Sequence, residues 1–311
     1  MVKVTTRVQL SETPAEVQEL VAEREVARAA KDFARADILR QEIASHGYLV
    51  NDVPGSYELL KQGDGGKSAE RHYLVLFGSG ENAPSSVDIY RQLFLSLGKR
   101  DLRVALVTTP AGFQPNVAAV YGEIKDFLLA SLPDFNLTID IIYANTATEA
   151  NDPHVVDPID SADIIFTGPG SPTYAAKHLK GTLLLKKIIE RVKNRATLIL
   201  ASAATISFSR HALPVYEIYK VGEDLHWASG LDVYDALWQR ATIIPHFNNT
   251  EGGVGLDTSH CYVGKERFAK MKSLLPENEW LLGIDEHTAY IVDLDTGKAE
   301  IRGKGTAHTL D

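Results

Sequence analysis

The strongest constraint on the fold is an alternation of short apolar runs with helical patterns, which fills residues 71–311. Apolar runs rich in β-branched residues occupy 72–77, 104–107, 139–143, 164–166, 198–200 and 242–244. Helical patterns separate them at 85–97, 117–132, 183–193 and 265–274. This alternation predicts an α/β fold with a doubly wound, mostly parallel sheet, because crossover helices cover both faces of such a sheet. A final hairpin, 289–292 with 299–302, is expected to join it.

A small helical hairpin is expected near the start of the chain. Thr13 and Glu16 form a capping-box pattern, so a first helix should run from there to about residue 30. Asp32 is placed to cap a second helix, which should stop at Gly47. The two helices are therefore expected to pair as a hairpin.

A short strand pair and a linker should follow the hairpin. Residues 48–50 and 57–60 flank turn residues and predict two strands. Residues 61–68 are polar and glycine-rich, as flexible linkers are. We therefore expect a helical-hairpin module over 1–66 and an α/β domain over 67–311.

Composition excludes several classes of protein. A formal net charge of -9 in 311 residues gives no general attraction to nucleic acid. No window approaches the roughly 18 apolar residues that span a bilayer, and residues 1–10 lack the apolar segment of a secretory signal. The single cysteine, Cys261, cannot form an internal disulfide. We expect a cytoplasmic protein without a membrane anchor, and the sequence leaves a homo-oligomer open.

Polar residues follow the predicted strands, at the edge where open α/β sheets bind ligands. Ser202 lies at a strand-to-helix junction, where a sharp turn exposes a nucleophile and aims backbone amides at an oxyanion. His246 is a candidate general base, and Glu286 is a candidate to orient its imidazole. Each also has a structural interpretation: a helix N-cap, a packed histidine and a solvated charge. Their joint occurrence favours a Ser-His-Glu triad.

Other kinds of site fit the sequence less well. Gly170 and Ala203 are candidates for oxyanion-binding amides, although the glycine-rich loop 168–170 is also compatible with an ordinary turn. Neither this loop nor 78–80 completes a dinucleotide or phosphate motif. The adjacent pair His260-Cys261 lacks zinc-ligand spacing. We expect no metal and no cofactor, and we interpret Cys261 as a packed residue.

Further candidates for substrate binding lie on the same loops. They are Ser171, Tyr174, Asn248 and Asn249. Arg267, in the helix after the histidine loop, is a candidate to clamp a substrate carboxylate.

These motifs resemble the serine peptidase family that holds dipeptidase E and cyanophycinase, a branch of the class I glutamine-amidotransferase-like fold. The resemblance covers about 71–311 and rests on Phe-Gly-Ser-Gly-Glu at 77–81, the loop at 168–171, the elbow around 202, Ile-Pro-His-Phe-Asn-Asn at 244–249 and Gly-Ile-Asp-Glu at 283–286. It implies Ser202 as nucleophile, His246 as base, Glu286 as third member, and the amides of Gly170 and Ala203 as oxyanion donors. It also implies peptide substrates, with some members preferring an aspartyl residue beside the cut bond.

The elbow departs from the family pattern. The family usually has Gly-x-Ser-Ala-Gly, whereas Leu200 and Ala204 replace the two glycines here. A Cβ at such a position adds strain if φ is positive. The departure leaves a second interpretation open, in which the chain is a catalytically silent member of the fold that binds a ligand, a protein or tRNA.

Residues 20–40, followed by Gly47 and Asn51-Asp52, resemble the C-terminal region of bacterial cysteinyl-tRNA synthetase. In the synthetase this region belongs to the part that meets the tRNA anticodon end, which implies contacts from basic side chains to RNA phosphates. The candidates are Arg24, Arg28, Lys31, Arg35 and Arg40. Interleaved acidic residues nearly cancel these charges, which favours a scaffold or protein-contact module instead. The catalytic half of a synthetase is absent, so no aminoacylation is expected.

The sequence as a whole predicts a serine hydrolase that cleaves a peptide or amide bond in small substrates, aspartyl peptides among them. The silent binding protein remains the main alternative. A hydrolase that acts on an aminoacylated or peptidyl RNA is a third interpretation, and it would use both modules.

Overall fold

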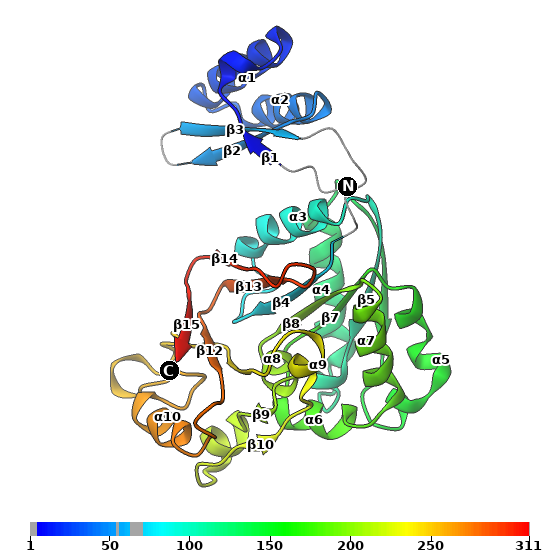
Figure 1. Cartoon of the computed structure of the whole chain (residues 1–311), viewed down its shortest axis with the longest axis vertical. Coiled ribbons are helices and arrows are strands. Elements are labelled where there is room, and N and C mark those ends of the chain that lie inside the picture. Colours follow the sequence, from blue (N-terminus) through cyan, green and yellow to red (C-terminus); the bar gives the residue numbers. More distant parts are fainter. Residues whose placement is uncertain (1–4, 54–55, 63–70, 311) are drawn as a thin grey trace. The chain divides into compact units, whose positions relative to one another are not determined.

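The computed structural model describes residues 5–53, 56–62 and 71–310, and the chain divides into two units, Met1–Glu70 and Arg71–Asp311 (Figure 1). The boundary expected between residues 66 and 67 lies outside the described residues, as does most of the expected linker. Each unit is considered by itself.

The described part of the N-terminal unit contains the expected helical hairpin and strand pair, together with a third strand. Its strands form an antiparallel sheet in the order β1-β3-β2. The third strand, β1, is too short to show a periodic pattern, so only its pairing with β3 defines it. The elements are β1 (Thr5–Arg7), α1 (Ala15–Ala29), α2 (Phe33–Ser45), β2 (Tyr48–Val53) and β3 (Ser56–Gln62).

Both helices begin near the predicted residues, but only one of the two predicted N-caps is confirmed. The Asp32 side chain accepts a hydrogen bond from the backbone N–H of Arg35 at 3.0 Å and caps α2. The capping box predicted at Thr13 is wrong. The Thr13 hydroxyl donates to the carbonyl oxygen of Leu10 at 2.7 Å and thereby closes the preceding short turn, and Pro14 occupies the N-cap position of α1 without a side-chain bond.

A buried ion pair joins the first helix to the sheet of this unit. The Arg24 side chain is 1% exposed, and its guanidinium donates to both carboxylate oxygens of Asp52, at 2.7 and 2.8 Å. Arg28 donates to the same carboxylate at 3.0 Å. A guanidinium buried to this extent needs its counter-charge, because desolvation otherwise opposes burial. Asp52 therefore holds α1 against β2.

Replacement of Asp52 by Ala should destabilise the N-terminal unit by about 3 kcal/mol, because it leaves the buried charge of Arg24 without its main partner. Hydrogen exchange of the α1 amides in the full chain measures this loss. Asp37→Ala, on the exposed side of α2, is the matched control and should leave the exchange unchanged. Equal protection of α1 in both variants would contradict a stabilising role for the ion pair.

The described part of the larger unit contains a seven-stranded sheet in the order β14-β13-β4-β8-β7-β5-β6. The five strands from β4 to β6 in this order are parallel, and β13 and β14 continue the sheet as an antiparallel hairpin. This confirms the predicted α/β fold and its C-terminal hairpin. The strands are β4 (Tyr73–Phe77), β5 (Asp101–Val107), β6 (Asn136–Ile142), β7 (Ile164–Thr167), β8 (Thr197–Ala201), β13 (Thr288–Asp293) and β14 (Ala299–Gly303).

Helices cover both faces of this sheet, as in Figure 1. Successive residues of a strand point to opposite faces, so Leu198 and Leu200 join the core beneath α7, whereas Ile199 and Ala201 join the core beneath α3 and α4. The helices are α3 (Val87–Ser96), α4 (Val117–Ser131), α5 (Pro153–Val156), α6 (Pro172–Leu179), α7 (Leu183–Lys193), α8 (Ala203–Ser207), α9 (Val233–Leu237) and α10 (Lys265–Lys272).

One predicted strand lies elsewhere. β11 (Thr242–Ile244) pairs in parallel with β12 (Leu281–Ile284), and β15 (Ala307–Leu310) completes a separate small sheet. β11 therefore belongs to this small sheet and does not extend the large one. A further short pair is formed by β9 (His211–Ala212) and β10 (Ala228–Ser229). Within the described ranges, no helix is both long and apolar enough to cross a membrane.

Candidate active site

Ser202 lies in the sharp turn between β8 and α8. Its backbone has φ 49° and ψ -113°, which is unfavourable for a residue with a Cβ. Its N–H donates to the carbonyl oxygen of Phe77 at 3.2 Å, so the neighbouring strand β4 holds the turn. The side chain makes no capping hydrogen bond to α8, although Ser202 occupies the N-cap position. The alternative role of Ser202 as a helix cap therefore has no support in the geometry.

The Ser202 side chain is instead bonded to His246. Ser202 Oγ lies 2.9 Å from His246 Nε2, and His246 Nδ1 lies 2.8 Å from Glu286 Oε1. Ser202 follows β8 of the large sheet, whereas Glu286 follows β12 of the small sheet. β11 and β12 are parallel, so the residues that follow them, His246 and Glu286, emerge at the same edge. A serine, an imidazole and a carboxylate thus form one chain of hydrogen bonds.

Two asparagines hold Glu286, one at its carboxylate and the other at its backbone N–H. Asn249 Nδ2 donates to Glu286 Oε1 at 2.9 Å, and the backbone N–H of Glu286 donates to Asn248 Oδ1 at 2.8 Å. The sequence predicts a substrate contact for both Asn248 and Asn249. Their described partners are Glu286 and, for Asn249, also the N–H of Glu251 at 3.1 Å. The two side chains therefore hold Glu286 at its backbone and at its carboxylate.

The flanking residues of the elbow do not carry the strain that a Cβ would add at a positive φ. Ser202 is one of the described non-glycine residues with positive φ, but Leu200 and Ala204 are not. Leu200 is a β-strand residue and Ala204 a helical one, and both are fully buried. The Cβ atoms of Leu200 and Ala204 therefore add no positive-φ strain to the turn at Ser202.

Two backbone N–H groups, one in the glycine-rich loop and one directly after Ser202, are candidates to bind an oxyanion. In the part of the chain that the structure describes, the N–H groups of Gly170 and Ala203 have no hydrogen-bond partner. Gly170 has φ 145°, and a Cβ there would lie 2.0 Å from the carbonyl oxygen of Pro110. Only glycine fits at this point, because the loop packs against the backbone at Pro110. Gly170 lies on the loop after β7, and Ala203 is the first residue of α8.

The remaining predicted residues have other partners. Ser171 Oγ accepts from the N–H of Tyr174 at 3.2 Å and caps α6. The Tyr174 ring packs on His178, with centroids 4.2 Å apart. Arg267 Nε donates to the carbonyl oxygen of Val263 at 2.6 Å. A substrate contact by any of these residues stays a prediction.

A buried carboxyl group beside the triad was not singled out from the sequence. Glu81, which follows the Gly-Ser-Gly loop after β4, is 7% exposed, and burial raises its pKa, while the charges of His246 and His287 act in the opposite direction. Glu286 behaves differently: its hydrogen bond to His246 lowers its pKa, and the bond from Asn249 adds to this effect. The pKa values of the two glutamates are therefore shifted in opposite directions, that of Glu81 mainly by burial and that of Glu286 mainly by its hydrogen bonds. The signal in the sequence was the position of Glu81 directly after a strand and its loop.

Cys261 is packed in the interior, as predicted. The residue is 2% exposed, and burial raises the pKa of its thiol. A thiol in such surroundings is a poor nucleophile. Among the described residues, no three His, Cys, Asp or Glu side chains are grouped so that they could hold a metal ion.

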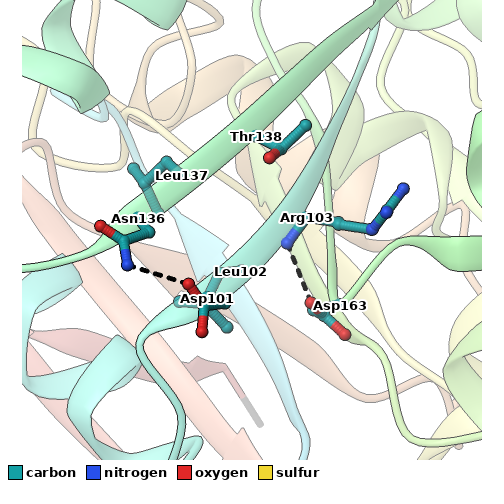
Figure 2. A pocket seen from close by; sticks show the side chains of 7 residues that line it. All are labelled: Asp101, Leu102, Arg103, Asn136, Leu137, Thr138 and Asp163. Atoms are coloured by element: carbon teal, nitrogen blue, oxygen red, sulfur yellow. Dashed lines mark hydrogen bonds between the residues drawn. The ribbon is translucent and has the colours of Figure 1, made fainter.

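A hollow of about 330 Å³ lies at the amino ends of β5 and β6 (Figure 2). Asp101 and Asn136 are the first residues of β5 and β6, and Asn136 donates to Asp101 there. Ser202, by contrast, follows the carboxyl end of β8. The hollow contains none of the triad residues, and ligands of open α/β sheets bind at the carboxyl edge.

Comparison with known proteins separates the two units. Residues 10–57 match the cysteinyl-tRNA ligase anticodon binding domain. The segment is 48% identical over 50 residues to a cysteine–tRNA ligase of Chlamydia abortus, and 60% identical over 40 residues to that of Solidesulfovibrio magneticus. These matches cover 16% and 13% of this chain but only 10% and 8% of the ligases. The chain thus spans about a tenth of the length of these relatives.

The larger unit has the fold of known peptidases. A peptidase from an acI-B1 Actinobacterium superposes with a TM-score of 0.59 and 21% identity, over 78% of this chain and 92% of that one. A putative peptidase E protein from Listeria monocytogenes EGD-e superposes with a TM-score of 0.49 and 16% identity, over 76% and 100% of the two chains. The first of these likenesses establishes a peptidase-like α/β fold.

Replacement of each of the two glutamates by Gln should shift stability with opposite dependence on pH. Glu286, with its lowered pKa, stabilises the fold above its unfolded pKa of about 4.3, and this contribution is lost as pH falls through the folded value. Glu81, with its raised pKa, contributes stability at low pH that is lost as pH rises through its folded value.

Thermal unfolding of both variants and the parent, at about pH 4 and about pH 8, tests these signs. Relative to the parent, Glu81→Gln should gain Tm on going to the higher pH. Glu286→Gln should have a Tm below the parent at the higher pH, and this deficit should shrink at about pH 4. If the Tm difference from the parent changed with pH in the same direction in both variants, the opposite pKa shifts of Glu81 and Glu286 would be contradicted.

Proposed function

We propose that the larger unit is a serine hydrolase that cleaves a peptide or amide bond, with Ser202 as nucleophile, His246 as general base and Glu286 as the orienting acid. The hydrogen-bonded chain from Ser202 Oγ through His246 to Glu286 Oε1, with links of 2.9 and 2.8 Å, is the observation that carries this proposal. The strained turn at Ser202 supports it, because such strain is found where a side chain must be held for function.

The first half of the reaction forms an acyl-enzyme. Ser202 Oγ attacks the carbonyl carbon while its proton passes to His246 Nε2, and the carbonyl oxygen becomes an oxyanion. The amides of Gly170 and Ala203 are the proposed donors to this oxyanion. The C–N bond then breaks as the proton on Nε2 passes to the leaving amine. Glu286 stabilises the imidazolium that exists between the two transfers.

The second half returns the free enzyme. A water molecule attacks the acyl carbon, and His246 takes its proton. The ester bond to Ser202 breaks, Ser202 Oγ recovers that proton, and a carboxylic acid leaves. Small peptides, with aspartyl peptides among them, are the proposed substrate class, supported by the peptidase fold of the larger unit.

Treatment with a fluorophosphonate should add one group to the parent chain. Ser202 Oγ attacks phosphorus, fluoride leaves and the proton passes to His246, so intact mass reports an activated serine. Ser202→Ala should remove the adduct, and His246→Ala should slow labelling by about 10³-fold or more. Ser273→Ala, at an exposed serine in the cap of α10, is the control and should be labelled like the parent.

An unlabelled parent, or a label that survives Ser202→Ala, would contradict the hydrolase. The first result would favour the alternative function, in which the chain is a catalytically silent member of the fold that binds a ligand without cleaving it. In the second case the activated group lies elsewhere in the chain.

A contact of the N-terminal unit with tRNA is a second proposal, supported by the match of residues 10–57 to an anticodon binding domain. The contacts inside the unit narrow the set of basic residues. Arg24 is buried and paired with Asp52, so it serves the fold. Arg35 pairs with Glu23 at 3.2 Å. Lys31 and Arg40 are exposed, and they are the better candidates to reach phosphates.

Filter binding of tRNA to the full chain tests this second proposal. The double variant Lys31→Glu, Arg40→Glu should weaken binding by about tenfold or more and reduce its salt dependence, because two cations that meet phosphates are reversed. Lys304→Glu, an exposed residue of the larger unit, is the control and should bind like the parent. Equal binding by all three chains would remove the N-terminal unit as an RNA contact.

A further inference from the structure

The segment behind His246 has an unusual backbone. Three consecutive non-glycine residues, His260, Cys261 and Tyr262, have φ values of 55°, 58° and 67°. The left-handed conformation brings the Cβ of an L-residue too close to the following carbonyl oxygen, so such residues normally occur singly. A run of three persists only where the surrounding structure dictates it.

The backbone of the triad histidine holds this turn from one side. The N–H of Cys261 donates to the carbonyl oxygen of His246 at 3.1 Å, and the N–H of His260 donates to that of Phe247 at 2.9 Å. Cys261 is buried, and the His260 ring packs on Phe247 with centroids 4.3 Å apart. The turn and the histidine loop are therefore joined by two backbone hydrogen bonds as well as by packing.

Arg267 holds the turn from the other side. Its Nε donates to the carbonyl oxygen of Val263 at 2.6 Å, and its Nη2 lies 3.3 Å from the carbonyl oxygen of Tyr262. Tyr262 is the last residue of the left-handed run, and Val263 follows it directly. A planar guanidinium fixes two neighbouring acceptors at once, which a lysine ammonium does less well.

The turn places the Tyr262 side chain against the imidazole of His246. The two ring centroids are 5.7 Å apart, at an interplanar angle of 52°. The Tyr262 ring is itself fixed by two contacts: it packs on Tyr219 with centroids 5.4 Å apart, and its hydroxyl donates to Glu251 Oε2 at 3.1 Å. A ring held at both its face and its tip is a rigid support for whatever packs against it.

We propose that Tyr262 is a positioning residue for His246, and that the left-handed turn, held by Arg267, exists to place its ring. This inference rests on the proposed function of the triad. The hydrogen bonds to Ser202 and Glu286 fix the imidazole at its two nitrogens, and the Tyr262 ring restricts its tilt between them. Misplacement of a reacting group by about 1 Å can cost on the order of 100-fold in rate, so a support of this kind bears directly on the proton transfer.

Glycine at residue 262 separates the ring from the backbone strain. Tyr262→Gly removes the ring and also relieves the positive φ, so the turn itself should be retained. Tyr262→Phe keeps the ring and loses the bond to Glu251. Asp232→Gly is the matched control, since Asp232 is an exposed residue with φ 56° in the N-cap position of α9.

Fluorophosphonate inactivation, analysed as a maximal rate and an apparent affinity, distinguishes positioning from binding. Tyr262→Gly should lower the maximal rate about 10- to 100-fold with little change in affinity, and Arg267→Gln should lower it about tenfold. Tyr262→Phe and Asp232→Gly should remain within about threefold of the parent. An unchanged maximal rate in Tyr262→Gly, or a change in affinity alone, would overturn the proposal.

Proton NMR gives a readout that does not depend on activity. The proton between His246 Nδ1 and Glu286 should give a downfield signal in the parent, identified by its loss in His246→Ala. This signal should broaden or vanish in Tyr262→Gly and stay sharp in Tyr262→Phe. A sharp signal in Tyr262→Gly would overturn the positioning role whether or not Ser202 is labelled, whereas an unlabelled parent would count against the triad alone.

Discussion

The arrangement of the triad depends on the backbone at the end of β4. The carbonyl oxygen of Phe77 accepts from the N–H of Ser202, and that of Gly78 accepts from the N–H of His246, each at 3.2 Å. The N–H of Gly78 donates to Thr288 at 2.9 Å, and a Cβ on Gly78 would lie 2.1 Å from the carbonyl oxygen of Asp285. Two adjacent peptide units thus position the serine, the histidine and the loop that carries the glutamate. Only glycine permits so close an approach.

The energy for this arrangement comes from the buried sheet around it. Ser202, His246 and His287 all have positive φ near 50°, a conformation that costs free energy in residues with a Cβ. β4 and β8 are buried along their full length and pack on both faces, so the residues that follow them cannot relax without disturbing the core. The strained backbone at Ser202 is in this sense a consequence of the packing of the sheet. The same reasoning covers the left-handed turn behind His246.

Charge is distributed unevenly around the triad. Glu286 is held as a carboxylate by hydrogen bonds, whereas burial favours the neutral form of Glu81. A carboxylate next to the imidazole supports its protonated form during proton transfer. The N-terminal unit uses charge for a different purpose, since the ion pair of Arg24 with Asp52 serves its own packing.

Much of the fold could be read from the sequence, because periodicity and capping are local properties. The buried strands, the Asp32 cap and the C-terminal hairpin each depend on residues close together in the chain. Two failures had non-local causes, since β1 is defined by its pairing with β3 and β11 by its pairing with β12. The third was local: two roles compete for the Thr13 hydroxyl, and it bonds to Leu10, three residues earlier, instead of capping α1.

For the site, the sequence by itself determined which residues could act, because Ser202, His246 and Glu286 each follow an apolar run with the required chemistry. Only the tertiary structure decided how they meet. The parallel pairing of β11 with β12 brings the histidine and the glutamate together, and the end of β4 brings them to the serine. The support of His246 by Tyr262 was likewise beyond the sequence, since three left-handed residues in a row have no local preference to reveal them.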